Sequence, residues 1–176
     1  MAGWGHLAGR FIRALRPGPL PAAERAWVGD VLTPEEFGLW ERLPGHDHHH
    51  TVEVARRVEA SLAGGPFAGD GRWPAAALLH DIGKLQSRLR VGGRVLATLV
   101  GRWGGRRVDA WTDAAGWRRR VSDYLRHDVI GAEMLRVAGG RPEPAHWAES
   151  HHGRTDLDRS LIPVEVAGVL AAADPD

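Results

Sequence analysis

The stretch Ala75-Ala76-Ala77-Leu78-Leu79-His80-Asp81-Ile82 decides the fold, because it is apolar on nearly every side and still carries two polar residues near its end. A run of this kind, opened by Pro74, predicts a helix that is buried on all its faces. An ionised Asp in such a place is very costly without a partner. His80 and Asp81 therefore predict a cation beside them, either an Arg side chain or a metal ion.

Four further residues favour the metal ion. Each extends the apolar face of another predicted helix by one potential ligand, at helical spacing. They are His50, His127, His151 and Asp174, in predicted helices over residues 47–62, 127–138, 142–152 and 163–174. A single His on an apolar face is usually a hydrogen-bonded core residue, but five such helices are hard to reconcile with chance. Neutral imidazole is a common metal ligand, so we expect these side chains to converge.

The rest of the chain is also predicted to be helical, and no segment shows the alternating pattern of a strand. Thr33 is a predicted N-cap, with Glu36 completing a capping box for a helix over residues 33–43. Residues 95–100 and 108–126 are predicted helices, the second with a break near Gly116. The predicted fold class is all-α, with an N-terminal helical arm over residues 1–30 and one domain over residues 31–176.

Composition excludes several classes of protein. The formal net charge of +1 shows no basic field, so no nucleic-acid partner is expected. No apolar stretch reaches the ~20 residues of a membrane-spanning helix. Cys is absent, which excludes disulfides and thiolate ligands and suits a reducing compartment, so a cytoplasmic location is expected.

The order His, His-Asp, His, His, Asp resembles the HD superfamily of metal-dependent phosphohydrolases. The matching segments are His50-Thr-Val-Glu-Val-Ala, Leu78-Leu-His-Asp-Ile-Gly-Lys84, His127-Asp-Val-Ile-Gly-Ala-Glu, His151-His152 and Ala171-Ala-Ala-Asp174. The segment around His80 is the most specific of them. The resemblance implies an HD-domain helical bundle. The Gly-Tyr-Pro signature of the cyclic-dinucleotide branch is missing after His152, which puts hydrolysis of cyclic dinucleotides in doubt.

The resemblance also implies a set of metal ligands. These are His50, His80, Asp81, His127, His151 and Asp174. His127 and His151 are similar to the extra His pair of the two-metal branch, in which Asp81 would bridge both divalent ions. Iron or manganese is favoured, because relatives with extra His ligands often use them. His50 is preferred over its neighbours because Val54 and Ala55 follow at the family spacing, so His48 and His49 are predicted to be exposed.

The activity implied by the resemblance is hydrolysis of a phosphoester or phosphoanhydride in a small, nucleotide-like molecule. A metal-activated hydroxide would be the nucleophile. Asp81 and Lys84 are the expected catalytic residues, and Lys84 would also bind a substrate phosphate as a point charge. Arg154 and His152 are further expected substrate contacts.

Two other functions use the same ligands or the same fold. Relatives such as inositol oxygenase bind a di-iron centre that activates oxygen, and Lys84 would suit a sugar alcohol as well as a phosphate. A non-catalytic HD binding module is the third alternative. It usually requires lost ligands, and none of the six positions is lost here.

Overall fold

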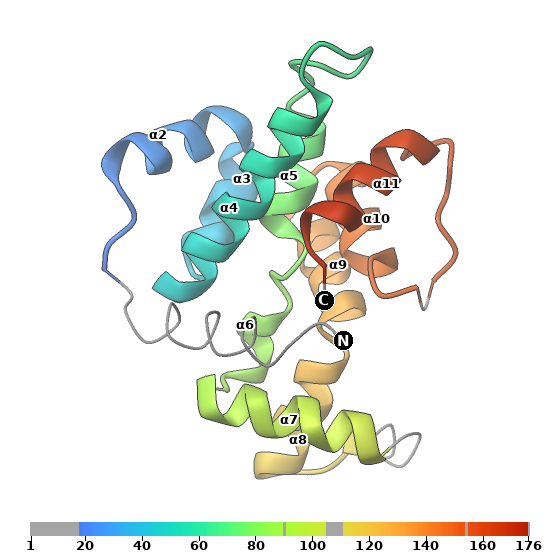
Figure 1. Ribbon diagram of the computed structural model, residues 1–176. Coiled ribbons are helices and arrows are strands. Elements are labelled where there is room, and N and C mark those ends of the chain that lie inside the picture. Colours follow the sequence, from blue (N-terminus) through green and yellow to red (C-terminus); the bar gives the residue numbers. More distant parts are fainter. Residues whose placement is uncertain (1–17, 90, 105–110, 154, 176) are drawn as a thin grey trace, which may run out of the picture.

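The computed structural model describes residues 18–89, 91–104, 111–153 and 155–175, and within these residues the chain is helical and contains no strand (Figure 1). The all-α prediction is confirmed. Three parts of the predictions lie outside the described residues. They are the expected substrate contact Arg154, residues 1–17 of the predicted N-terminal arm, and residues 108–110 of the predicted helix 108–126. None of the helices in the described part is long and apolar enough to cross a membrane.

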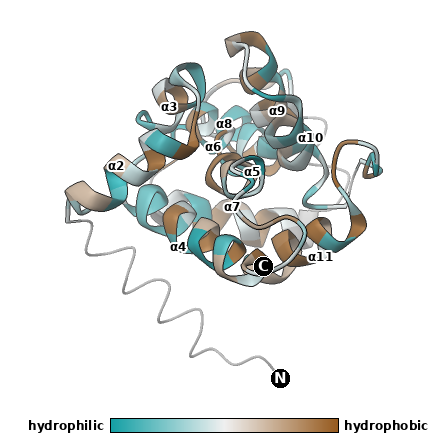
Figure 2. Ribbon diagram, turned by 90° about the horizontal axis from the view of Figure 1, so that it is seen from above, coloured by the Kyte–Doolittle hydropathy of each residue, from teal (hydrophilic) through white to brown (hydrophobic). Residues whose placement is uncertain are grey.

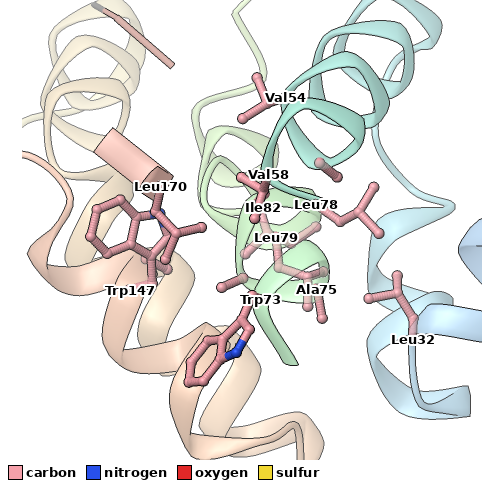
Figure 3. Close-up of a cluster of buried hydrophobic side chains, with 14 of the residues drawn as sticks. Leu32, Val54, Val58, Trp73, Ala75, Leu78, Leu79, Ile82, Trp147 and Leu170 are labelled. Carbon is pink, nitrogen blue, oxygen red and sulfur yellow. The ribbon is translucent and has the colours of Figure 1, made fainter. Parts of the chain in front are cut away.

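Helix α5 is the centre of the fold, as Figure 2 shows from above. Trp73, Leu78 and Leu79 of this helix are almost fully buried. Figure 3 shows Leu32 and Trp147 on opposite sides of α5. The helices are α2 (Ala22–Val31), α3 (Pro34–Trp40), α4 (Gly45–Leu62), α5 (Arg72–Leu79), α6 (Lys84–Ser87), α7 (Val91–Gly104), α8 (Gly116–Leu125), α9 (His127–Ala138), α10 (Pro142–Ser150) and α11 (Val164–Ala173).

Local sequence signals explain several helix ends. The capping box at the start of α3 is confirmed, since the Thr33 side chain accepts from the Glu36 backbone and the Glu36 side chain accepts from the Thr33 backbone. Helix α9 ends at Gly139, whose φ of 80° is left-handed and favours glycine. Residues 95–100 lie within α7, as predicted. Helix α8 begins only at Gly116, so the predicted helix was wrong for residues 112–115, which form a turn followed by an irregular segment.

Helices α7 and α8 form a separate layer, drawn at the bottom of Figure 1. A small apolar cluster around Leu89, Ala97 and Val121 holds this layer together. One guanidinium nitrogen of Arg94 in α7 lies 2.7 and 2.8 Å from the two carboxylate oxygens of Asp47, which is buried at the start of α4. This ion pair joins the layer to the helix that carries His50.

The predicted continuation of α5 through Ile82 is wrong. The helix ends at Leu79, and His80 to Gly83 form tight turns. Their hydrogen bonds span three residues, as from the Ile82 N–H to the Leu79 carbonyl and from the Lys84 N–H to the Asp81 carbonyl. The chain therefore changes direction at the two polar residues.

The prediction that His48 is exposed is also wrong. Its ring centroid lies 4.2 Å from that of Trp40, and its Nε2 lies 2.9 Å from the Trp40 carbonyl oxygen, so the side chain is half-buried. His49 is exposed, as predicted.

Candidate metal centre

The first of two groups of potential metal ligands in the described chain joins three distant segments. His50 comes from α4, His80 from the turn after α5, and Asp174 from the residue after α11. Their ligand atoms all lie within 4.8 Å of one another. The Nε2 atom of His80 lies 3.1 Å from one oxygen of Asp174, and the Nε2 atom of His50 lies 3.6 Å from the other.

The second group consists of His127 at the start of α9 together with His151 and His152, which directly follow α10. Their ligand atoms also lie within 4.8 Å of one another. The Nε2 atoms of His127 and His152 are 3.1 Å apart. Sequence reasoning assigned His152 to the substrate, and the structure places it beside the two expected ligands. The tandem His pair was the only sequence signal for this position.

Asp81 lies between the two groups. Its Oδ2 is 3.5 Å from the Nε2 of His80 and 3.9 Å from that of His50, whereas its Oδ1 is 3.2 Å from the Nε2 of His127. The side chain is 3% exposed. One carboxylate therefore faces both groups at once, which is the arrangement of a bridging ligand.

Three of the His rings are oriented in the same way by the backbone. The Nδ1 atoms of His80, His127 and His151 lie 2.7 to 2.8 Å from the carbonyl oxygens three residues earlier, those of Ala77, Tyr124 and Ala148. A ring that donates through Nδ1 keeps the lone pair of Nε2 for a metal, which is the usual arrangement of metal-binding imidazole.

The Nε2 atoms of His80 and His151 are buried and make no hydrogen bond within the protein. One oxygen of Asp174 lies 3.1 Å from the first of these nitrogens. A buried polar atom without a partner is costly, and a divalent cation would satisfy both nitrogens. The donor set therefore fits a metal ion.

Two glycines bring the Asp81 turn against α9. A Cβ atom at Gly83 would lie 2.0 Å from the His127 carbonyl oxygen and 2.6 Å from the Gly131 nitrogen. A Cβ atom at Gly131 would lie 2.9 Å from the Gly83 nitrogen. Only a backbone without side chains permits this approach, which sets the spacing between Asp81 and His127.

The pKa values reflect the concentrated charge. Burial opposes ionisation of Asp81, but the charges of Lys84 and His80 and the bond from His127 outweigh it and hold the pKa of Asp81 well below its usual value. Burial likewise opposes protonation of His80, and Asp81 with Asp174 overcomes this and raises the pKa of His80 to about 9. The Asp81 carboxylate raises the pKa of Lys84 despite its burial. The carboxylates therefore attract protons or other cations.

The His151 ring has the opposite character. Burial lowers the pKa of His151 to about 3, and the neighbouring charges of His80 and His152 act in the same direction. The ring is thus neutral at physiological pH and available as a ligand.

Lys84 lies beside the centre, and its ammonium group donates to Oδ2 of Asp81. A pocket of about 350 Å³ opens next to the centre, on a side that Lys84 does not line. The pocket is lined by Val54, His80, Trp147, His151, His152, Leu170, Ala171, Asp174 and Pro175. It therefore touches members of both His groups, and sequence reasoning did not find its apolar wall.

The comparison with protein families agrees with this site. The HD domain family model matches residues 47–174, which is most of the chain. The chain therefore belongs to the HD domain family, within the superfamily of metal-dependent phosphohydrolases, and HD domains bind divalent metals. Searches of curated proteins and of solved structures gave no match.

Proposed function

We propose that this protein is a metal-dependent phosphohydrolase that cleaves a phosphoester or phosphoanhydride in a small, nucleotide-like molecule. The observation that carries the proposal is the Asp81 carboxylate, which has one oxygen 3.2 Å from His127 and the other 3.5 Å from His80. Membership of the HD family adds support.

Two divalent ions fit the two groups, with iron or manganese favoured. His50, His80 and Asp174 would hold the first ion, and His127 and His151 the second, with Asp81 shared between them. His152 would join the second set or contact the substrate. When bound, such ions act as Lewis acids that activate water and neutralise phosphate charge.

The chain itself contributes a fixed array of donors around the phosphate site. Three rings are held by backbone carbonyls, so little reorganisation is needed when a substrate binds. Lys84 supplies a half-buried positive charge one turn from His80. This ammonium group would bind a phosphate oxygen, and its charge beside Asp81 favours the ionised form of that carboxylate.

Metal content and phosphate release test the proposal together. Elemental mass spectrometry of the purified protein should find about two iron or manganese ions per chain. Asp81→Ala should lose both the ions and phosphate release from nucleotide esters. His50→Ala should lose the first ion alone, and His49→Ala is the matched control because His49 is exposed on the same helix.

Three results would contradict the proposal. A protein that neither carries nor takes up metal would be a binding module. Activity that survives Asp81→Ala would show that Asp81 is not needed as a ligand shared by the two ions. Substrate-dependent oxygen consumption without phosphate release would indicate an oxygenase.

A further inference from the structure

The pocket beside the metal centre has two chemically different sides. His80, His151, His152 and Asp174 form one side. The other side is apolar, and Figure 3 shows three of its residues, Val54 from α4, Trp147 from α10 and Leu170 from α11. Ala171 and Pro175 are exposed and lie at its rim. Val54 and Leu170 are each 2% exposed and Trp147 is 8% exposed, so the exposed Ala171 and Pro175 supply much of the apolar surface next to the proposed site of reaction.

The distribution of charge in the pocket is uneven as well. None of the described residues that line it is Lys or Arg. Lys84 contacts Asp81 and is not a lining residue. Ligand pockets combine mostly apolar walls with a few polar groups that fix orientation. A phosphate would thus be held at the His and Asp side, and the apolar side would favour a group without charge.

We propose that this pocket binds the leaving group of the substrate, and that the substrate is a phosphomonoester of an uncharged molecule with an apolar or aromatic face. This inference rests on the proposed function. A volume of about 350 Å³ is near the lower end for ligand pockets, which suits a single ring or nucleoside. A leaving group with several more phosphates would place negative charge on an apolar wall at a high desolvation cost.

The reaction is an ordinary hydrolysis. The bond between phosphorus and the ester oxygen breaks, and a water oxygen forms a new bond to phosphorus. One water proton goes to the departing oxygen, so the products are phosphate and a neutral alcohol. No oxidant or further reactant is required.

Two phosphonates, compared at a pH where both carry the same charge, isolate the contribution of the pocket. Methylphosphonate and phenylphosphonate would be titrated calorimetrically into the manganese-loaded protein. Phenylphosphonate should bind roughly tenfold or more tightly, a typical discrimination for an apolar pocket. Equal affinities would overturn the inference.

Ala171 and Ala172 form a matched pair, because both are exposed on α11 and only Ala171 lines the pocket. Ala171→Trp should fill the pocket and abolish the preference for phenylphosphonate, whereas Ala172→Trp should preserve it. A preference that survives Ala171→Trp would contradict the assignment.

Ala171→Arg distinguishes the two kinds of leaving group. The long Arg side chain should occupy the space of the ring and weaken phenylphosphonate binding if the pocket takes an uncharged ring. Stronger binding of inorganic tripolyphosphate to this variant than to the wild type, with phenylphosphonate unaffected, would show that the pocket takes further phosphates. Because binding is measured without turnover, a protein that prefers phenylphosphonate but releases no phosphate would disprove the proposed hydrolase and leave the pocket assignment intact.

Discussion

Replacing Gly83 by Ala adds one methyl group at the contact between the Asp81 turn and α9. The backbone of Gly83 has φ −65° and ψ −17°, which an Ala residue adopts without strain. In an open position, this change would stabilise the protein by about 0.4–1 kcal/mol, because Ala restricts the unfolded chain. Any loss of stability therefore measures the contact itself.

The geometry sets the size of that loss. The new Cβ would lie 2.0 Å from the His127 carbonyl oxygen, and real Cβ contacts essentially never fall below 3.0 Å. The turn and α9 must therefore separate by roughly an ångström, and the opposing atoms belong to a backbone that cannot rotate away. Overpacking of a core typically costs 1–3 kcal/mol, so we expect Gly83→Ala to lower the free energy of unfolding by about 3 kcal/mol.

Urea unfolding monitored by circular dichroism measures this change, and elemental mass spectrometry reports its effect on the centre. Because α9 would be displaced, metal binding at the His127 group should weaken more than metal binding at the His50 group. Gly168→Ala is the matched control, because Gly168 is exposed in α11 with no atom within 4 Å of its added Cβ. It should be stabilising by about 0.5 kcal/mol.

A second variant checks the reasoning if Gly83→Ala does not fold. The Cβ added at Gly131 approaches the Gly83 nitrogen only to 2.9 Å, so Gly131→Ala should destabilise less than Gly83→Ala. If Gly83→Ala were as stable as the wild type and bound the same amount of metal, the close backbone approach would not be what positions Asp81.

Lys84→Met should lower kcat/KM for phosphate esters at least tenfold, while the variant keeps the metal content of the wild type. Unchanged kinetics would show that Lys84 does not contact the substrate. Glu36→Gln should cost about 3 kcal/mol by breaking a buried ion pair. Burial opposes the ionisation of Glu36, but its partner Arg141 lowers the pKa of Glu36 below 4.5, so this stabilisation is present above pH 4.5 and lost as the pH falls through the lowered pKa. Urea unfolding should therefore show the stabilities of wild type and variant converging in acid. A difference in stability that stays constant with pH would contradict this. Thr51→Val should cost about 1–2 kcal/mol in thermal unfolding, because Trp40 Nε1 would lose its buried acceptor at 3.1 Å, and an unaltered Tm would refute this.

Side-chain chemistry and helical spacing were enough to predict the all-α class. Both depend on residues that are near one another in the chain, such as Thr33 and Glu36 of the confirmed capping box. The family was predicted for the same reason, since the Leu-Leu-His-Asp-Ile-Gly-Lys segment is contiguous. The ligand roles of His50, His127, His151 and Asp174 stay predictions, although the structure brings His50 and His127 to Asp81. It also groups Asp174 with His50 and His151 with His127.

The local pattern failed where a tertiary contact overrode it. Apolar residues run on through Ile82, so the periodicity predicted a continuous helix. The contact of Gly83 with α9 instead requires the chain to turn after Leu79. Nothing in the neighbourhood of Gly83 in the sequence indicates a partner almost fifty residues later.

The sequence by itself determined the helical class, which candidate ligands are present, and their order along the chain, because each follows from the identity and spacing of nearby residues. Only the tertiary structure decided that His152 joins His127 and His151, that the two oxygens of Asp81 face different groups, and that an apolar pocket opens beside them. These features depend on the relative positions of helices distant in sequence, and packing around α5 sets those positions.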